Sequence, residues 1–295
     1  MINATWLETF TTLCETGHFT QAAQRLNMTQ PGVSQHLRKL ETQVGRPLVV
    51  QEGKRFSLTP AGEAVLDLGR SRRMEERRLR EQIEGDDPDI GEVRIACSGS
   101  FATLLYPRAR TIMQNAPNLC IHLEAAPQTG VLEGLVKNSL DLGVLGYDPK
   151  HPLLDAQRIG QEELCLVLNI GAPEPVTFDS LQTLGFVAHP DGFGYADELF
   201  SLNFPDEFSG AGDLRRRTFV NQIGQIPTPV ADGIGYTLLP RSGVEAFIDK
   251  DRLKLVSLPH RCYHELWLVT RRRVPLKARV KRIAQEIRKA AESLG

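Results

Sequence analysis

Residues 19–44, FTQAAQRLNMTQPGVSQHLRKLETQV, contain two amphipathic segments separated by Asn27-Met28-Thr29-Gln30. In the first segment Thr20 is a suitable N-cap, and a small apolar face follows it: Ala22, Ala23 and Leu26. The second segment begins at Pro31, which is favoured in a first helical turn, and continues to about Val44. Two short helices joined by a tight turn, with alanines where they cross, are typical of a helix-turn-helix.

The segments on either side complete a small winged unit. Residues 5–14, TWLETFTTLC, place apolar side chains three and four apart, which predicts an earlier amphipathic helix that ends at Gly17. Residues 48–59 are expected to form a hairpin with Gly53-Lys54-Arg55 at its tip. Because the tip carries two cations, this wing is expected to reach a phosphate backbone. Residues 1–60 therefore predict an all-α domain with a wing.

The second helix of the pair has the side chains that a helix needs in a major groove. It exposes amides, a hydroxyl and cations but almost no carboxylate. Amides bind adenine edges there, and cations bind guanine edges or phosphates. A generic three-helix packing unit with a solvated polar face is the alternative. The residues expected to bind DNA are Thr20, Thr29, Gln30, Pro31, Ser34, Gln35, Arg38, Lys39, Lys54 and Arg55.

A long linker helix is expected after the wing, from Pro60 to about Glu84. Its apolar stripe is interrupted in the middle by arginines and glutamates between Arg70 and Arg78. Because no neighbouring chain is expected to supply a core for the stripe, a second copy of the helix is the predicted partner. The alternatives are an exposed, salt-bridged helix that packs on its own domain, and arginines that lie along phosphates.

From residue 90 onwards short apolar strands alternate with helices. Strands are predicted at 92–97, 121–125, 140–145, 164–168, 185–188, 236–239 and 266–270, and helices at 101–115, 196–202 and 242–249. This alternation predicts a parallel or mixed sheet with helices on its faces. In such sheets ligands bind at the carboxyl ends of strands, against helix N-termini.

The loops after these strands are rich in hydroxyl groups, amides and free backbone N–H groups. Each loop alone could be an ordinary cap, but together they favour a small polar or anionic ligand. The residues expected to bind it are Ser98, Gly99, Ser100, Phe101, Gln128, Thr129, His189, Asn221 and Gln222.

The net charge of the 295 residues is −1, which at first argues against nucleic-acid binding. The charge is uneven along the chain, however. Residues 1–60 hold six basic and four acidic residues, residues 86–270 hold 14 and 24, and residues 271–295 hold nine and two. An acidic segment that need not meet DNA therefore dominates the average. Because the basic excess of residues 1–60 is only two, binding is expected to depend on two or more copies acting together.

The composition, with 41% hydrophobic and 24% charged residues, is typical of a soluble protein of more than one domain. No apolar run approaches the roughly 18 residues of a membrane span. The first residues, MINATWLETF, do not have the pattern of a secretory signal. Five cysteines without a C-x-x-C spacing favour thiols in a reducing cytoplasm. A cytoplasmic protein without a membrane partner is therefore expected.

Residues 19–62 resemble the DNA-binding domain of LysR-type transcriptional regulators. Val49 and Gln51 stand where the family usually has an aromatic residue and an arginine, so Lys54 and Arg55 are expected to supply that phosphate contact. The matching positions are Ala22-Ala23, Leu26, Gln30-Pro31, Val33-Ser34, Leu40-Glu41, Gly45, Leu48 and Leu58-Thr59-Pro60-Ala61-Gly62.

The later part of the chain resembles the effector-binding domain of the same family, so the likeness covers essentially the whole sequence. It rests on Ser100, seven residues before Pro107, and on the segments 140–142, 232–235 and 238–240. The family's effector domain is an α/β domain of two subdomains, hinged like a periplasmic binding protein of type II. Pro227 and Pro229 fall where the family usually has a helix, so this helix is expected to begin at Pro227 or beyond.

The resemblance implies three parts. These are a winged helix-turn-helix domain at 1–60, a linker and dimerisation helix with a hinge at 61–88, and an α/β effector-binding domain at 89–295. Within the last part, subdomain I is expected at about 90–162 plus 267–295, and subdomain II at about 163–266.

The residues and the resemblance together predict a transcription regulator that is not an enzyme. Helix 30–44 is expected to bind double-stranded promoter DNA, and a small effector, by family likeness often an organic acid, to bind between the subdomains. Closure of that cleft would change the angle between DNA-binding units in a homodimer or homotetramer. RNA polymerase is a further candidate partner, and no catalytic residue, cofactor or metal is expected. The effector, the operator and the sign of regulation stay open.

Several other constellations favour different functions. Ser98 or Ser100 with His189 and Asp191 would suit a hydrolase, although there is no G-x-S-x-G elbow. Cys97 borders the predicted ligand site and would suit an oxidant sensor, with a packed core thiol as the alternative. The cations of 271–282 would suit a second DNA surface, with a solvated helix face as the alternative. A small-molecule-binding module without regulation is also open, and the histidines and cysteines have no metal-ligand spacing.

Overall fold

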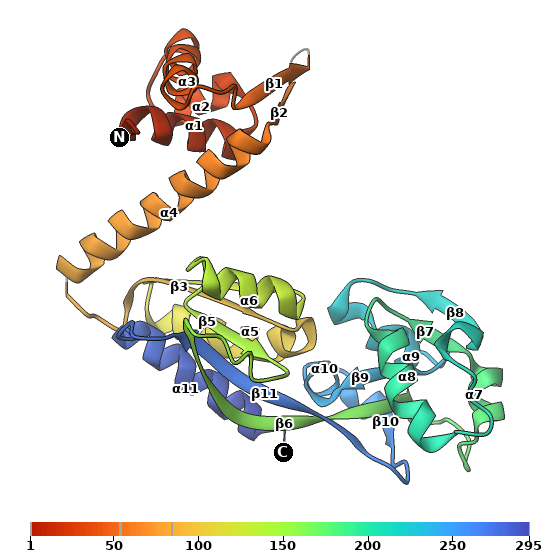
Figure 1. Ribbon diagram of the computed structural model, residues 1–295. Helices are drawn as coiled ribbons and strands as arrows, with labels where there is room; N and C mark the ends of the chain where they lie inside the picture. The colour runs from red at the N-terminus through yellow and green to blue at the C-terminus, as the bar shows by residue number, and fades with distance from the viewer. Residues whose placement is uncertain (1, 53–54, 84, 295) are drawn as a thin grey trace. The chain divides into compact units, whose positions relative to one another are not determined.

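The first unit of the chain, residues 1–85, is built from helices and one β-hairpin (Figure 1). The computed structural model describes residues 2–52, 55–83 and 85–294. In chain order the elements of this unit are α1 (Ala4–Thr16), α2 (Phe19–Arg25), α3 (Gln30–Val44), β1 (Val49–Glu52), β2 (Arg55–Leu58) and α4 (Pro60–Ile83).

One apolar core forms where α1, α2 and α3 meet. Phe10, Val33 and Leu40 are fully buried in it, and the small side chain of Ala22 lets α2 approach its neighbours closely. Gly17, with φ of 69°, ends α1 in the left-handed conformation that glycine adopts without strain. The predicted helix-turn-helix with a wing is confirmed.

The start of α2 differs from the prediction. Phe19 is the first helical residue and His18 is the N-cap, so Thr20 lies inside the first turn and does not cap the helix. Phe19 also packs edge-on against Phe56 of β2, with ring centroids 5.8 Å apart. This contact with the wing favours the earlier start, and no pattern within 20–26 could have revealed it.

The first half of α4 packs on α1. Val65 and Leu66 are each 7% exposed and belong to the core of the first unit. The expectation that no neighbouring chain supplies a core for this helix is therefore wrong for its first half. Other members of the apolar stripe of α4 face outward, since Leu68 is 44% and Leu79 58% exposed.

In the described part of the second unit, residues 86–295, one mixed sheet has seven strands in the order β10-β6-β11-β5-β3-β4, with β9 also paired to β6. β3 is parallel to β4 and β5, whereas β11 is antiparallel to β5 and β6. A smaller parallel pair, β7 (Phe186–Ala188) and β8 (Arg216–Phe219), lies apart from it. The strands of the large sheet are β3 (Ile90–Cys97), β4 (Asn118–Ala125), β5 (Leu142–Leu145), β6 (Leu154–Asn169), β9 (Thr237–Pro240), β10 (Leu253–Val256) and β11 (Cys262–Arg271).

Helices cover both faces of this sheet. Since side chains alternate along a strand, Val93 and Ile95 of β3 contact α5 and α11, while Ala96 faces α6 on the other side. The helices are α5 (Gly99–Asn115), α6 (Gln128–Val136), α7 (Phe178–Leu184), α8 (Gly192–Asn203), α9 (Pro227–Ala231), α10 (Arg241–Glu245) and α11 (Ala278–Glu292), with single turns η1 (Ala211–Asp213), η2 (Ile223–Gln225) and η3 (Lys250–Arg252).

The C-terminal half of β6 separates two further apolar cores, because its side chains also point alternately to the two faces of the sheet. Leu164 and Leu166 pack with the aromatic cluster of α7 and α8, whereas Cys165 and Val167 pack with α9 and α10. Figure 1 shows β6 and β11 as long strands that run from the first half of the unit into the second. Their pairing extends from Leu154 to Leu164 on β6.

Several element boundaries differ from those expected. β6 begins ten residues earlier than the predicted strand 164–168, because its first half carries polar side chains that hide the strand pattern. α10 ends at Glu245, before the predicted end at 249, and α7 was not predicted. α9 does begin at Pro227, as the two prolines predicted. No helix in the described part of the chain has the length and apolar character that a membrane span needs.

Candidate nucleic-acid interface and ligand site

The first turn of α3 is fixed by Thr29. Its hydroxyl accepts a hydrogen bond from the backbone N–H of Gly32 at 3.2 Å, so Thr29 is the N-cap. Pro31 follows in the first turn, where its missing N–H costs nothing. Thr29, one of the predicted DNA-binding residues, therefore uses one lone pair of its hydroxyl to fix the start of α3.

The outer face of α3 carries exposed polar side chains opposite the core. Gln35, Arg38 and Thr42 lie on one stripe with Pro31, since a helix turns about 100° per residue. Within the described residues the side chain of Arg38 has no hydrogen-bond or ion-pair partner. Its guanidinium is thus available to a base edge or a phosphate. Thr42, which the sequence analysis did not single out, lies on the same face, and its hydroxyl donates to the carbonyl of Arg38 at 2.8 Å.

The remaining predicted residues of α3 lie beside this stripe. Gln30 is exposed and Ser34 half-buried on one flank. Lys39 lies on the other flank, with its ammonium 5.6 Å from the ring centroid of Trp6. The cation–π contact holds Lys39 next to α1, away from the middle of the outer face. Thr20 is exposed on α2.

The wing has the predicted hairpin form. β1 and β2 pair from Val49 with Leu58 to Glu52 with Arg55, so Arg55 is the first residue of a strand and does not belong to the tip. Lys54 and the side chain of Arg55 lie outside the described residues. The carboxylate of Glu41 accepts a hydrogen bond from the N–H of Leu48 at 2.8 Å, which ties the base of the wing to α3.

The segment 58–62, LTPAG, fixes the linker helix to the wing. The hydroxyl of Thr59 donates to the carbonyl of Pro47 at 2.7 Å and accepts from the N–H of Gly62 at 3.0 Å. A Cβ atom on Gly62 would lie 2.0 Å from the carbonyl oxygen of Leu48. The backbone approach therefore requires glycine at this position.

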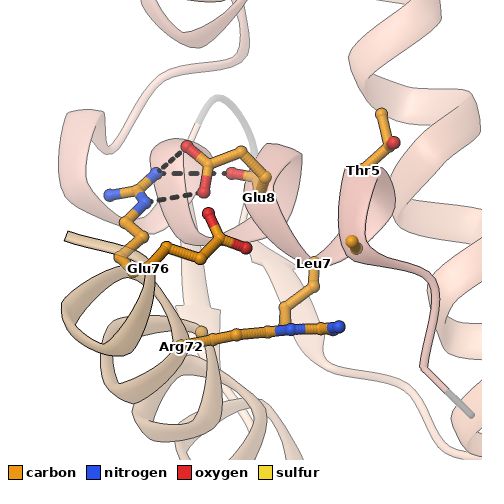
Figure 2. A pocket seen from close by; sticks show the side chains of 8 residues that line it. Thr5, Leu7, Glu8, Arg72 and Glu76 are labelled. Atoms are coloured by element: carbon orange, nitrogen blue, oxygen red, sulfur yellow. Dashed lines mark hydrogen bonds and ion pairs between the residues drawn. The ribbon is translucent and has the colours of Figure 1, made fainter. Parts of the chain in front are cut away.

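An arginine and two glutamates join α4 to α1. Arg73 binds the carboxylate of Glu8 through two nitrogens, at 2.7 and 2.6 Å, and that of Glu15 at 2.7 Å. A groove of about 580 Å³ lies beside this contact. Figure 2 shows Thr5, Leu7 and Glu8 of α1 along it. Arg72 and Glu76 project from α4 along the same groove. Charged side chains line part of the groove: Glu8, Arg72, Arg73 and Glu76.

In the second unit, the first predicted ligand loop joins β3 to α5. Ser98 caps α5 and accepts a hydrogen bond from the N–H of Phe101 at 3.3 Å. A Cβ atom on Gly99 would lie only 1.8 Å from Cδ1 of Ile223, so η2 covers the start of α5. Ser100 is 8% exposed and faces Gly243 of α10.

Phe101 requires a correction. Its side chain is fully buried in the core with Val93 and Leu105, so this ring cannot contact a ligand outside the core. The sequence placed Phe101 with its neighbours in the loop because they adjoin a strand end. Helical geometry instead turns residue 101 inward, toward the sheet.

The second predicted loop lies next to the first. The N–H of Ala126 donates to the carbonyl of Cys97 at 3.0 Å, which brings the start of α6 beside the start of α5. Gln128 and Thr129 are exposed there. The Gln128 side-chain carbonyl already accepts a hydrogen bond from Gly146 N–H at 3.0 Å. Asn221 and Gln222 are exposed directly before η2, on the segment that carries Ile223 over Gly99.

His189 differs from the other predicted ligand residues because it is buried, with 2% exposure. Its Nε2 donates to the carbonyl of Leu238 at 2.9 Å, and burial lowers its pKa. His189 is therefore a buried, hydrogen-bonded core histidine. Neither Ser98 nor Ser100 is hydrogen-bonded to it in the described chain, so the geometry of a serine–histidine pair is not assembled.

A small cavity of about 210 Å³ adjoins the start of α5. It lies beside the two close approaches described above, of η2 to Gly99 and of α10 to Ser100. Its walls are mostly apolar, with one hydroxyl, and none of them was among the predicted effector-binding residues, because they come from separate elements. The lining residues are Thr103, Ile223, Gly224, Pro227, Gly243, Ala246, Phe247 and Ile248.

The second unit also contains a buried carboxyl group, that of Glu162, and a buried thiol, that of Cys97. Glu162 of β6 is 3% exposed, and its carboxylate accepts a hydrogen bond from the N–H of Ser242 at 2.9 Å. Burial raises the pKa of Glu162. Cys97 is fully buried, and burial raises the pKa of its thiol to about 12. Since the thiolate is the form that oxidants attack, this environment favours a packed core thiol over an oxidant sensor.

Family models match both units of the chain. Residues 4–63 match the model for bacterial regulatory helix-turn-helix proteins of the lysR family. Residues 86–292 match the LysR substrate binding domain. One curated relative, the HTH-type transcriptional regulator ShiR of Corynebacterium glutamicum, is 30% identical over 207 residues, which cover 67% of this chain and 70% of ShiR.

Solved structures share the fold along the whole chain. A variant of full-length OxyR from Pseudomonas aeruginosa has a TM-score of 0.67 at 17% identity, covering 100% of this chain and 99% of that one. CbnR, described as a LysR family transcriptional regulator, has a TM-score of 0.66 at 22% identity, covering 98% and 99%.

Proposed function

The chain belongs to the LysR family of bacterial transcriptional regulators, and on this premise we propose which of its residues bind DNA and effector. It is a DNA-binding regulator with an effector-binding domain. We propose that the domains are 1–60, 61–88 and 89–295. The protein then acts in the cytoplasm by binding, without catalysis, and RNA polymerase is a candidate partner at the promoter.

The outer face of α3 is the proposed contact with the major groove. The observation that carries this proposal is the exposed guanidinium of Arg38, which lacks a partner in the described chain and lies beside Gln35. Arg38 suits a guanine edge and Gln35 an adenine edge. Gln30, Ser34 and Lys39 lie on the flanks, where phosphates run along the groove. The wing, with Lys54 and Arg55, would contact the adjacent backbone.

Fluorescence anisotropy with labelled promoter fragments tests this assignment. Arg38→Ala is expected to weaken specific binding by about 1–3 kcal/mol per half-site, the usual loss for a bidentate base contact. Arg110→Ala, which removes an exposed charge from α5 in the other unit, is the matched control and should bind as the wild type does. Equal affinity of the two variants would contradict the proposed role of α3.

We propose that the effector binds at the start of α5, in the cavity between α5, η2 and α10. Ser98, Ser100, Gln128, Thr129, Asn221 and Gln222 are the proposed polar groups around it, and an organic acid suits the N-terminus of α5. Subdomain I is then about 90–162 plus 267–295, and subdomain II about 163–266. The pairing of β6 with β11 changes register between Leu266 and Trp267, which supports a hinge at this boundary.

A thermal-shift screen of small organic acids on the full-length protein tests the effector site. A ligand at 100 times its Kd adds about 2.7 kcal/mol of stability. Thr103 lines the cavity, and Thr111 lies two turns later on α5, where each hydroxyl donates to the carbonyl four residues earlier. Thr103→Val should therefore reduce the shift and Thr111→Val should not. The same shift in both variants would place the ligand elsewhere.

The groove between α1 and α4 is the proposed place where two copies of the chain pair. Arg72 and Glu76 lie one turn apart along it. In an antiparallel pair of linker helices whose two-fold axis passes between these positions, each Arg72 would face Glu76 of the other copy. The exposed Leu68 and Leu79 would lie along the same contact. This arrangement supports a homodimer, or a homotetramer built from such dimers.

A further inference from the structure

Three side chains with metal-binding chemistry converge at one side of the second unit. His264 Nε2 lies 2.7 Å and Cys262 Sγ 3.7 Å from the same carboxylate oxygen of Glu198. The ligand atoms that the three residues offer all lie within 4.8 Å of one another. These residues have no part in the proposed DNA or effector contacts.

The fold brings the three residues together from two elements. Cys262 and His264 are two apart on β11, so they point to the same side of the strand, while Tyr263 between them faces outward. Glu198 comes from α8, which packs against that side. Tyr195, one turn earlier on α8, has its ring centroid 5.6 Å from that of His264 and so limits how the imidazole can turn.

The spacing of the ligand atoms suits a tetrahedral zinc ion. With Zn–S near 2.3 Å and Zn–O or Zn–N near 2.0 Å, such an ion separates a sulfur and an oxygen ligand by about 3.5 Å, and a nitrogen and an oxygen ligand by about 3.3 Å. The observed Cys262–Glu198 distance of 3.7 Å is close to the first value. The His264–Glu198 distance of 2.7 Å must widen by about 0.6 Å, which the half-exposed Glu198 side chain allows.

A second Cys-x-His pair in the chain shows what distinguishes the site. On β4, Sγ of Cys120 lies 3.3 Å from Nε2 of His122. The same nitrogen lies 3.0 Å from a carboxylate oxygen of Glu92. There, however, the guanidinium of Arg94 binds the same oxygen of Glu92 at 2.6 Å, and a fixed cation opposes a metal ion. Among the described residues no lysine or arginine is paired with Glu198.

We propose that Cys262, His264 and Glu198 bind one Zn²⁺ ion, with water as the fourth ligand. Thiolate and imidazole favour zinc over Mg²⁺ or Ca²⁺, and a carboxylate completes the three protein ligands of an open zinc site. On binding, the Cys262 thiol releases its proton to solvent and forms the Zn–S bond. The ion would join α8 to β11, the strand that runs through both halves of the unit.

Cobalt titration of untagged, metal-free, full-length protein tests the proposal. One Co²⁺ per chain should bind with a thiolate-to-cobalt charge-transfer band, and Zn²⁺ should displace it. Cys262→Ser should abolish the band, and His264→Ala should weaken binding more than about 100-fold, since loss of an outer partner alone costs 10–100-fold. Cys120→Ser is the matched control and should retain the band.

Glu198→Gln provides a second test, because a half-exposed side chain can change without loss of the fold. It should weaken Co²⁺ binding while far-ultraviolet circular dichroism stays that of the wild type. Absence of stoichiometric binding, a band that survives in Cys262→Ser, or a band that disappears in Cys120→Ser would each overturn the assignment.

Discussion

Replacement of Gly69 by alanine tests how the linker helix is held. A Cβ atom there would lie 2.0 Å from Oγ1 of Thr11 and 3.4 Å from Cδ1 of Leu7. The Thr11 side chain is fully buried, and its hydroxyl donates to the carbonyl of Leu7 at 2.8 Å. Room for the methyl group is therefore made at the cost of this hydrogen bond and of the close packing between α4 and α1.

The magnitude follows from three opposing contributions. Loss of the Thr11 hydrogen bond costs about 1 kcal/mol, and overpacking costs about 2 kcal/mol. Alanine in place of glycine inside a helix gains about 1 kcal/mol. The first unit is therefore expected to lose about 2 kcal/mol of unfolding free energy on Gly69→Ala.

Tryptophan fluorescence during urea unfolding can report this unit alone. The chain has two tryptophans, Trp6 in the first unit and Trp267 in the second, so a Trp267→Phe background isolates the signal of Trp6. Gly194→Ala is the matched control, since a Cβ atom on this helical glycine meets nothing within 4 Å. It should leave the Trp6 transition unchanged. If Gly69→Ala stabilises the first unit, α4 does not pack on α1 as described.

Three further predictions concern the dimer, a thiol and a buried acid. Arg72→Glu should dissociate the dimer in analytical ultracentrifugation and Arg72→Glu with Glu76→Arg should restore it; a single variant that stays dimeric would refute the charge pairing. Cys97, whose pKa is about 12, should stay unmodified by a thiol reagent at neutral pH while the exposed Cys120 reacts, and equal rates would contradict the burial of Cys97. Burial raises the pKa of Glu162 in the folded state above its pKa in the unfolded chain. Ionisation of Glu162 therefore lowers the free energy of unfolding above the folded-state pKa and has no such cost below the unfolded-state pKa. Glu162→Gln should stabilise the second unit at alkaline pH and lose this gain in acid, and a pH-independent effect would disprove this role of Glu162.

The sequence predicted the parts of the fold that have local causes. Gly17 ends α1 by its left-handed conformation, and Pro227 begins α9, because both effects lie in the residue itself. The helix-turn-helix could be predicted because the small side chain of Ala22 lies where its helices cross and the apolar side chain of Val33 faces their core. The start of α2 was predicted too late: Phe19 is its first residue, and its ring packs against Phe56, far along the chain.

The candidate ligand site was less predictable, because burial depends on tertiary packing. Ser98 and Gln128 were predicted from their place after strand ends, and both are exposed. The pattern did not distinguish them from His189, whose ring donates to Leu238 in the core. The approach of Ile223 to Gly99, and of Glu198 to Cys262, joins residues more than sixty positions apart. No local spacing reports such contacts.

Competition binding to DNA tests the central claim most directly. The wild-type protein should bind fragments from upstream of its own gene and of neighbouring genes more tightly than scrambled fragments of equal length. Its affinity should fall steeply as salt rises, because phosphate contacts release counterions, while the preference for one fragment persists. Equal binding to genuine and scrambled fragments at every salt concentration would contradict the account of α3 as a sequence-specific DNA-binding helix.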